Sequence, residues 1–137
     1  MARPWRVLVI ALVVGALAVT GAVASAVHTG TLSPKLVGKW SRKATSADVK
    51  RTGGIGITPG SVWTLTIKKN DYAAVEGSAG GFEGYMHPVG SSRIRTNVAI
   101  GIAVYGWHVS GNRLTLTKVS DQTPDREAVF EGVWKKK

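Results

Sequence analysis

The sequence predicts an all-β protein: an eight-stranded antiparallel up-and-down barrel that follows an N-terminal hydrophobic export segment. Apolar residues recur at every second position after residue 35, which is the pattern of strands with one buried face. Clusters rich in Gly, Asn and Pro separate these runs, and no long amphipathic helix follows residue 27. Short strands joined by tight turns favour a meander, and closing a meander into a barrel removes its exposed edges.

The alternating runs give eight expected strands. The clearest covers residues 93–99, with Arg93, Arg95 and Asn97 facing outward. The residues that alternate with them, Ile94, Thr96 and Val98, face inward. A tight hairpin connection is expected at residues 110–112, Ser-Gly-Asn. The other expected strands are residues 36–43, 62–69, 72–78, 82–87, 104–110, 113–120 and 127–135.

The connection over residues 44–60 is much longer than the others. Residues 44–51 can form one or two helical turns, whereas glycines and Pro59 exclude a helix from the second half. Long connections in compact domains commonly serve as lids or are disordered. We expect a flexible flap near the mouth of the barrel.

Residues 1–26 have the organisation of a secretory signal peptide. A positive start is followed by the uncharged residues 7–27, which contain the small-residue pattern Ala24-Ser25-Ala26. An uncharged run of 21 residues is also long enough to span a bilayer, so an uncleaved membrane anchor is the alternative. We therefore expect an exported protein, either secreted or anchored to the outer face of the cytoplasmic membrane, with a flexible leader at 27–35 and the barrel at 36–137.

Composition excludes several kinds of site. The chain has no cysteine, so disulfides and thiolate metal sites cannot form. Its net charge is +10, but the basic residues are scattered, with Lys135 to Lys137 as the only run of three, so a solvated charge on the barrel exterior is the simplest interpretation. The alternative is an envelope-interaction module whose basic surface binds anionic polymer or a membrane surface.

The sequence predicts no catalytic site, metal site or cofactor. It has no G-x-S-x-G nucleophile pattern, and His28, His87 and His108 are not spaced as metal ligands. Glu76 and Glu83 flank a turn, which leaves a hydrolase as a weaker alternative. Most aromatic residues share the phase of the apolar residues and are expected in the core. We therefore expect no nucleic-acid partner, and a monomer.

A G-x-W motif marks both the first and the last expected strand. Gly38 stands two residues before Trp40, and Gly132 stands two residues before Trp134. Between these motifs follow a Y-x-W strand, a G-N turn and an L-T-L strand, all within residues 105–116. With these motifs the chain resembles the lipocalins, in particular small exported bacterial lipocalin-like domains of the calycin type.

The resemblance implies both a fold and a function. It implies that Trp40 closes the narrow end of the barrel and packs under an arginine, for which Arg126 is the nearest candidate by position. It also implies a non-catalytic barrel that binds a small apolar or amphipathic ligand, or stays empty as a scaffold. The residues expected to line a ligand pocket are Trp63, Leu65, Tyr72, Phe82, Met86, Ile94, Val98, Tyr105 and Trp107.

Overall fold

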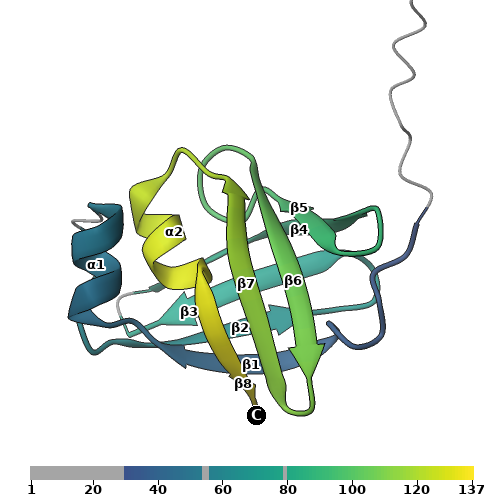
Figure 1. The fold of residues 1–137 in the computed structure, drawn as a ribbon, viewed down its shortest axis with the longest axis horizontal. Coiled ribbons are helices and arrows are strands. Elements are labelled where there is room, and N and C mark those ends of the chain that lie inside the picture. Colours follow the sequence, from purple (N-terminus) through teal and green to yellow (C-terminus); the bar gives the residue numbers. More distant parts are fainter. Residues whose placement is uncertain (1–29, 54–55, 79) are drawn as a thin grey trace, which may run out of the picture.

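The computed structural model describes residues 30–53, 56–78 and 80–137, and the expected export segment lies outside these ranges. The described chain forms one closed barrel in which eight strands pair in sequence order, each pair antiparallel (Figure 1). The predicted eight-stranded antiparallel up-and-down barrel is therefore confirmed. The strands are β1 (Gly38–Lys43), β2 (Val62–Ile67), β3 (Tyr72–Gly77), β4 (Gly80–Val89), β5 (Arg93–Thr96), β6 (Ala103–Ser110), β7 (Arg113–Ser120) and β8 (Gly132–Lys136).

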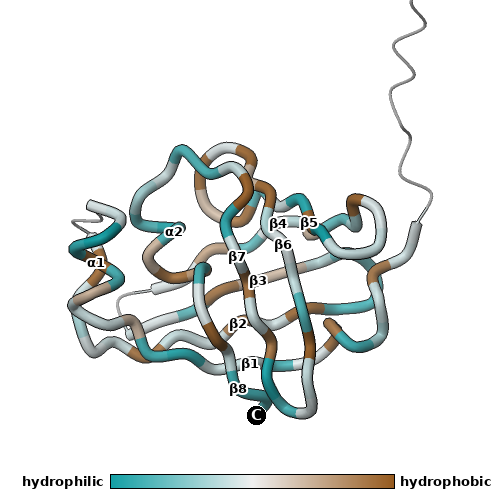
Figure 2. The backbone as a smooth tube through the Cα atoms, viewed as in Figure 1, coloured by the Kyte–Doolittle hydropathy of each residue, from teal (hydrophilic) through white to brown (hydrophobic). Residues whose placement is uncertain are grey.

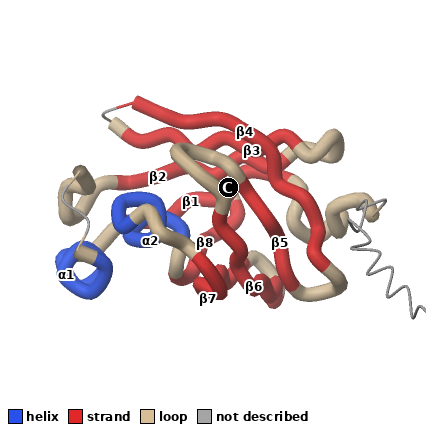
Figure 3. Tube along the Cα trace, turned by 90° about the horizontal axis from the view of Figure 1, so that it is seen from above, coloured by secondary structure: helices blue, strands red, loops and turns tan. Residues whose placement is uncertain are grey.

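The two ends of the barrel differ. Helices α1 (Ser46–Thr52) and α2 (Pro124–Phe130) both lie at the end where β1 stops, which we call the mouth (Figures 1 and 3). Residues 30–37 enter at the opposite end, where short turns join β2 to β3, β4 to β5 and β6 to β7. We call this the closed end. Among the described residues, neither helix has the length or the apolar character to cross a bilayer.

The interior is filled by one row of side chains from each strand. In β2, Trp63, Leu65 and Ile67 are buried while the residues between them are partly exposed, as the alternation predicts. Hydrophobic residues likewise alternate with polar ones along the strands in Figure 2. The largest fully buried side chains are Leu36, Trp40, Leu65, Ile67, Met86, Ile94, Val98, Tyr105, Leu114, Leu116, Phe130 and Trp134.

The two G-x-W motifs form matching units on neighbouring strands. Both tryptophans have no exposed surface. Trp40 Nε1 donates to the Leu36 carbonyl and Trp134 Nε1 to the Phe130 carbonyl, both at 2.9 Å. Because β1 pairs with β8, the two units lie on either side of the strand pair that closes the barrel. Each indole is therefore buried without losing a hydrogen bond.

The glycines of these motifs have backbone conformations that other residues rarely adopt. Gly38 has φ 140° and Gly132 has φ 136°. A Cβ at Gly132 would also lie 2.5 Å from the Arg42 guanidinium. At the last strand, glycine is thus required by both the backbone and the neighbouring side chain.

Helix α1 confirms the expected helical turns in the long connection. Thr45 caps it, because its hydroxyl accepts from the Asp48 N–H and the Asp48 carboxylate accepts from the Thr45 N–H. Gly53, at φ 70°, ends the helix in the left-handed conformation. The connection lies at the mouth, as expected.

The prediction of a strand over residues 127–135 is wrong in its first half. Residues 127–130 belong to α2, and β8 begins at Gly132. Pro124 occupies the first turn of the helix together with acidic residues, a common start signal. All of Arg126 to Phe130 is buried, so the run shows no polar face that would have distinguished a helix from a strand.

Several strand boundaries also differ from expectation. Strand β5 ends at Thr96, so residues 97–99 of the expected strand 93–99 lie in the loop to β6. Strand β4 is longer than residues 82–87, because Gly80 and Gly81 pair with β3 and Pro88 pairs with β5. The barrel domain begins before residue 36, since Leu32, placed in the leader by the sequence, is buried in the core.

Gly132→Ala should lower the free energy of unfolding by about 2–4 kcal/mol, because the new methyl group meets Arg42 and the backbone is forced from a glycine-only conformation. Urea unfolding followed by tryptophan fluorescence measures this. Gly106→Ala is the matched control, since its Cβ would meet nothing closer than 3.8 Å and its φ is ordinary. An equal loss in both variants would contradict the role given to Gly132.

Candidate ligand-binding site

A pocket of about 380 Å³ opens at the mouth of the barrel. It lies between the first residues of β2 and β4, the loop that joins β5 to β6, and helix α2. We call it the mouth pocket. Its lining residues are Gly56, Ile57, Trp63, Val75, Gly80, Gly81, Phe82, Ala99, Ile100, Thr123, Asp125, Arg126 and Val129.

Trp63 forms one wall of the mouth pocket and is held in a fixed orientation. Its Nε1 donates to the Ser61 hydroxyl at 2.9 Å, and its ring lies against the backbone of Gly77. A Cβ at Gly77 would stand 2.9 Å from three ring carbons, so only glycine permits this contact. The orientation of the indole is thus fixed by contacts within the protein.

The rim of the mouth pocket exposes apolar side chains. Phe82 is 52 % exposed and Ile100 is 79 % exposed, although both line the pocket. The loop that carries Ile100 forms a hydrophobic edge at the mouth (Figure 2). Exposed apolar groups around a concave site are typical of a surface that binds an apolar partner.

Arg126 is buried beneath the mouth pocket and is fully engaged by the protein. Its guanidinium forms an ion pair with Asp121 at 2.6 Å, and both side chains are almost completely buried. Its Nη1 also donates to the carbonyl oxygens of Val98, Ile100 and Gly101, at 2.9–3.1 Å. Arg126 therefore fixes the β5–β6 loop to α2 and has no free donor to offer an anionic ligand.

Asp121 has a lowered pKa. Burial alone would raise this pKa, but hydrogen bonds from Arg126, from the Tyr105 hydroxyl and from the Thr123 N–H outweigh burial. Burial, followed by the bond to Asp121, raises the pKa of Tyr105. The carboxylate is thus charged and the phenol neutral over the physiological range, which is the state that this buried network requires.

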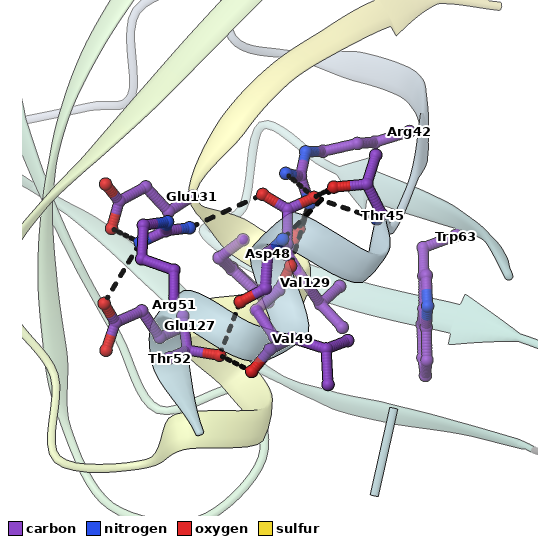
Figure 4. Close-up of polar contacts among 12 residues, drawn as sticks. Arg42, Thr45, Asp48, Val49, Arg51, Thr52, Trp63, Glu127, Val129 and Glu131 are labelled. Atoms are coloured by element: carbon purple, nitrogen blue, oxygen red, sulfur yellow. Dashed lines mark hydrogen bonds and ion pairs between the residues drawn. The ribbon is translucent and has the colours of Figure 1, made fainter. Parts of the chain in front are cut away.

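A second polar network joins α1 to α2 across the mouth (Figure 4). Arg42 pairs with Asp48 at 2.8 Å and donates to the Ala128 and Val129 carbonyls. Arg51 of α1 lies within 3.3–3.5 Å of three carboxylates, those of Asp48, Glu127 and Glu131.

This network fixes the cover of the mouth pocket. Trp63 stands to one side of it in Figure 4. Asp125 of α2 accepts from the Gly56 N–H at 3.1 Å, so the connection after α1 is held against α2 as well. Burial would raise the pKa of Asp48, yet bonds from Thr45 and the charge of Arg42 leave it lowered.

Of the nine predicted ligand-binding residues, the mouth pocket contains Trp63 and Phe82. Trp107 is half-buried against the core, on the part of β6 that leads to the closed end. The others, except Tyr72, are packed side chains of the filled interior with no exposed surface: Leu65, Met86, Ile94, Val98 and Tyr105.

Two of the expected residues have other surroundings than the sequence predicts. Tyr72 lies on the outer face of β3, where its hydroxyl donates to Glu83 at 2.8 Å, because Ala73 and Val75 take the inward positions. The cation over the Trp40 ring is Lys136, whose Nζ lies 5.3 Å from the centroid, and Arg126 instead binds Asp121. Arg126 belongs to the mouth, whereas Trp40 packs toward the closed end.

The sequence pattern does not identify several of the pocket residues. Ile57 and Ile100 lie in connections that carry no periodicity, and Val129 falls in the predicted last strand. A usable signal for Ile57 was the pair of isoleucines among glycines at 55–57, since apolar residues in a glycine-rich loop must find a partner.

The two carboxylates considered for hydrolysis lie on the outer wall of the barrel. Glu76 pairs in register with Gly81, and Glu83 with Ala74, so they are not directly opposite each other. Both are exposed, and Glu83 is engaged by Tyr72.

No protein-family model, curated protein or solved structure matches the chain.

Asp121→Asn should lower the free energy of unfolding by about 3–5 kcal/mol at pH 7, because it leaves Arg126 buried without its counter-charge. The folded-state pKa of Asp121 is lowered, so its contribution is complete above the unfolded value of about 4 and is lost as the pH falls through the folded value. Urea unfolding of both proteins from pH 7 to pH 2 should show their stabilities converging in acid.

Tyr105→Phe is the milder companion variant, since it removes one hydrogen bond to Asp121 and retains the ion pair. It should cost roughly 1 kcal/mol at pH 7. A difference between wild type and Asp121→Asn that stays constant down to pH 2 would contradict the role assigned to the carboxylate.

Proposed function

We propose that this chain is an exported, non-catalytic lipocalin-like barrel that binds a small apolar molecule, or the apolar part of an amphipathic one, in the mouth pocket. The proposal of export rests on the signal-like residues 1–26. The lipocalin assignment is supported by eight antiparallel strands in sequence order and by the buried G-x-W tryptophan of the first strand. Two features of this chain differ from what the resemblance implies. A helix, α2, precedes the last strand, and the cation over the Trp40 ring is a lysine.

The observation that carries the binding proposal is the apolar rim of the mouth pocket. Phe82 and Ile100 remain exposed at its edge, beside the wall formed by Trp63. Their contact with a ligand would remove apolar surface from water, which is the main source of affinity in small-molecule sites. A volume of about 380 Å³ is at the lower end of the range that such sites occupy.

The packing of the barrel limits the depth at which a ligand can bind. Leu65, Met86 and Ile94 fill the centre and have no exposed surface. A ligand therefore occupies the mouth and does not enter the barrel. This arrangement favours a short or flat apolar group over a long chain threaded along the barrel axis.

The polar groups near the pocket favour binding over catalysis. Arg126 is saturated by Asp121 and three carbonyls, and Asp125 accepts from the Gly56 N–H. These contacts hold the walls in place and leave the affinity to the apolar surfaces. Turnover of a glycoside that is lost on changing Glu76 or Glu83 would support the hydrolase alternative.

Binding of the uncharged fluorescent probe N-phenyl-1-naphthylamine tests this function. The protein should bind it saturably with one site. The double variant Phe82→Ser/Ile100→Ser should bind about thirtyfold more weakly, since each change removes roughly 1 kcal/mol of apolar contact.

Val133→Ser is the matched control, because Val133 is 48 % exposed on β8 and does not line the mouth pocket. It should bind the probe as the wild type does. Absence of saturable binding to the wild type, or equal weakening in the control, would refute the proposal.

A further inference from the structure

The charges of this protein are divided between the two ends of the barrel. Five of the eight acidic residues lie at the mouth, on or beside α1 and α2: Asp48, Asp121, Asp125, Glu127 and Glu131. In the described ranges, each ion pair made by a Lys or Arg is also at the mouth, with the cations Arg42, Arg51, Lys118 and Arg126. The mouth therefore neutralises much of its own charge.

The closed end carries cations without ion-pair partners. Among the described residues, the acidic side chain at the closed end is Asp71, whose carboxylate lies 3.0 Å from His87 Nδ1. Glu76 and Glu83 lie on the outer wall of β3 and β4. The cations of the closed end are Lys35, Lys39, Lys68, Lys69, Arg93, Arg113, Lys135, Lys136 and Lys137.

Two of these cations lie where their mutual repulsion lowers the stability of the free protein. Arg113 of β7 stands directly opposite Lys135 of β8. Both point outward, since their neighbours Leu114 and Trp134 are buried. Like charges opposite each other destabilise a sheet, and β1, β7 and β8 carry no acidic residue to compensate.

Lys39 extends this surface onto β1. Lys39 is exposed. Ser41, two residues further along the same face of β1, pairs with Lys135 of β8. Lys137 reaches over the same wall, with its Nζ donating to Thr64 at 3.1 Å. The outward residues of β7, β8 and β1 that lie nearest the closed end thus form a basic surface, whereas Lys43 lies at the mouth end of β1.

The path of the chain connects this end to the hydrophobic segment, which in the uncleaved alternative is a membrane anchor. The uncharged run ends at Val27, and the described structure begins three residues later at Gly30, at the closed end. Residues 30–37 lie on the side opposite the helices in Figures 1 and 3. A bilayer that holds the hydrophobic segment would lie nearer the closed end than the mouth.

We infer that the closed end, with the outward residues of β7, β8 and β1 nearest to it, docks on the surface of an anionic phospholipid bilayer. Unpaired lysines and arginines near such a surface gain attraction to the headgroups and lose the mutual repulsion that they have in solution. The mouth pocket then faces away from the membrane. This inference goes beyond the ligand-binding proposal and does not depend on it.

Vesicle sedimentation tests the inference directly. All core side chains of the described barrel lie between Leu32 and Trp134, so a chain starting at Val27, the expected mature form, contains the whole barrel. It should sediment with vesicles of phosphatidylglycerol and phosphatidylcholine in equal parts and not with pure phosphatidylcholine. Binding should fall steeply as salt rises to about 0.5 M, because exposed charges are screened.

Two triple variants with the same net charge locate the binding surface. Lys39→Gln/Arg113→Gln/Lys135→Gln removes unpaired cations from the basic surface and should weaken vesicle binding on the order of a hundredfold, about fivefold for each charge. The control, Lys43→Gln/Lys50→Gln/Arg95→Gln, removes exposed cations nearer the mouth and should weaken binding less than tenfold.

Both triple variants should still bind N-phenyl-1-naphthylamine, which separates failure of this inference from failure of the pocket. Equal loss of vesicle binding in both would show that net charge alone is responsible and would overturn the inference. Binding to soluble polyphosphate without binding to vesicles would also overturn it, in favour of an anionic polymer as the partner.

Single labels establish the orientation, since the chain has no cysteine of its own. Asn112→Cys places an environment-sensitive fluorophore in the β6–β7 turn at the closed end, and Gln122→Cys places it in the mouth loop. On anionic vesicles the label at 112 should shift to the blue and be protected from an aqueous quencher, and the label at 122 should not. The opposite pattern would overturn the inference.

Discussion

Closure of the barrel depends on the short pairing between β1 and β8. Only two residue pairs join these strands in register, against six between β1 and β2. Side chains strengthen this seam: Trp40 and Trp134 are buried on either side of it, and Arg42 reaches from β1 to the Ala128 and Val129 carbonyls of α2. If the seam opened, both strands would become unpaired edges in a protein that has no disulfide to restrain them.

The mouth pocket is a consequence of this seam. The Arg42 guanidinium contacts α2 and also pairs with Asp48 of α1, so one side chain from β1 sets both helices over the barrel. It can do so because Gly132, the residue that starts β8, leaves room for it. Arg126 then fixes the loop on the other side of the opening. The walls of the pocket are held by buried charge, whereas its exposed rim is apolar.

The barrel was predictable from the sequence because each strand buries one face. Apolar residues therefore recur at every second position along the strand. The G-x-W seam was predictable for the same reason, as both glycines and both tryptophans fall on the inward phase. Helix α2 was not, because Ala128, Val129 and Phe130 are buried in succession. The pocket residues were mostly missed, since periodicity gives the side that a residue faces and not whether neighbours fill the space before it.

The charge asymmetry also arises from topology. In an up-and-down barrel, alternate connections lie at the same end, so residues distant in sequence, such as Lys69 and Asn112, share one end while the residues between them cross to the other. Basic residues that look scattered along the chain are thereby collected at the closed end. Five of the eight acids lie on or beside the two helices at the opposite end, and four of them pair there with arginines that hold the helices in place. At the mouth, charged side chains thus hold the two helices over the pocket, whereas the lysines and arginines of the closed end make no ion pair within the described structure.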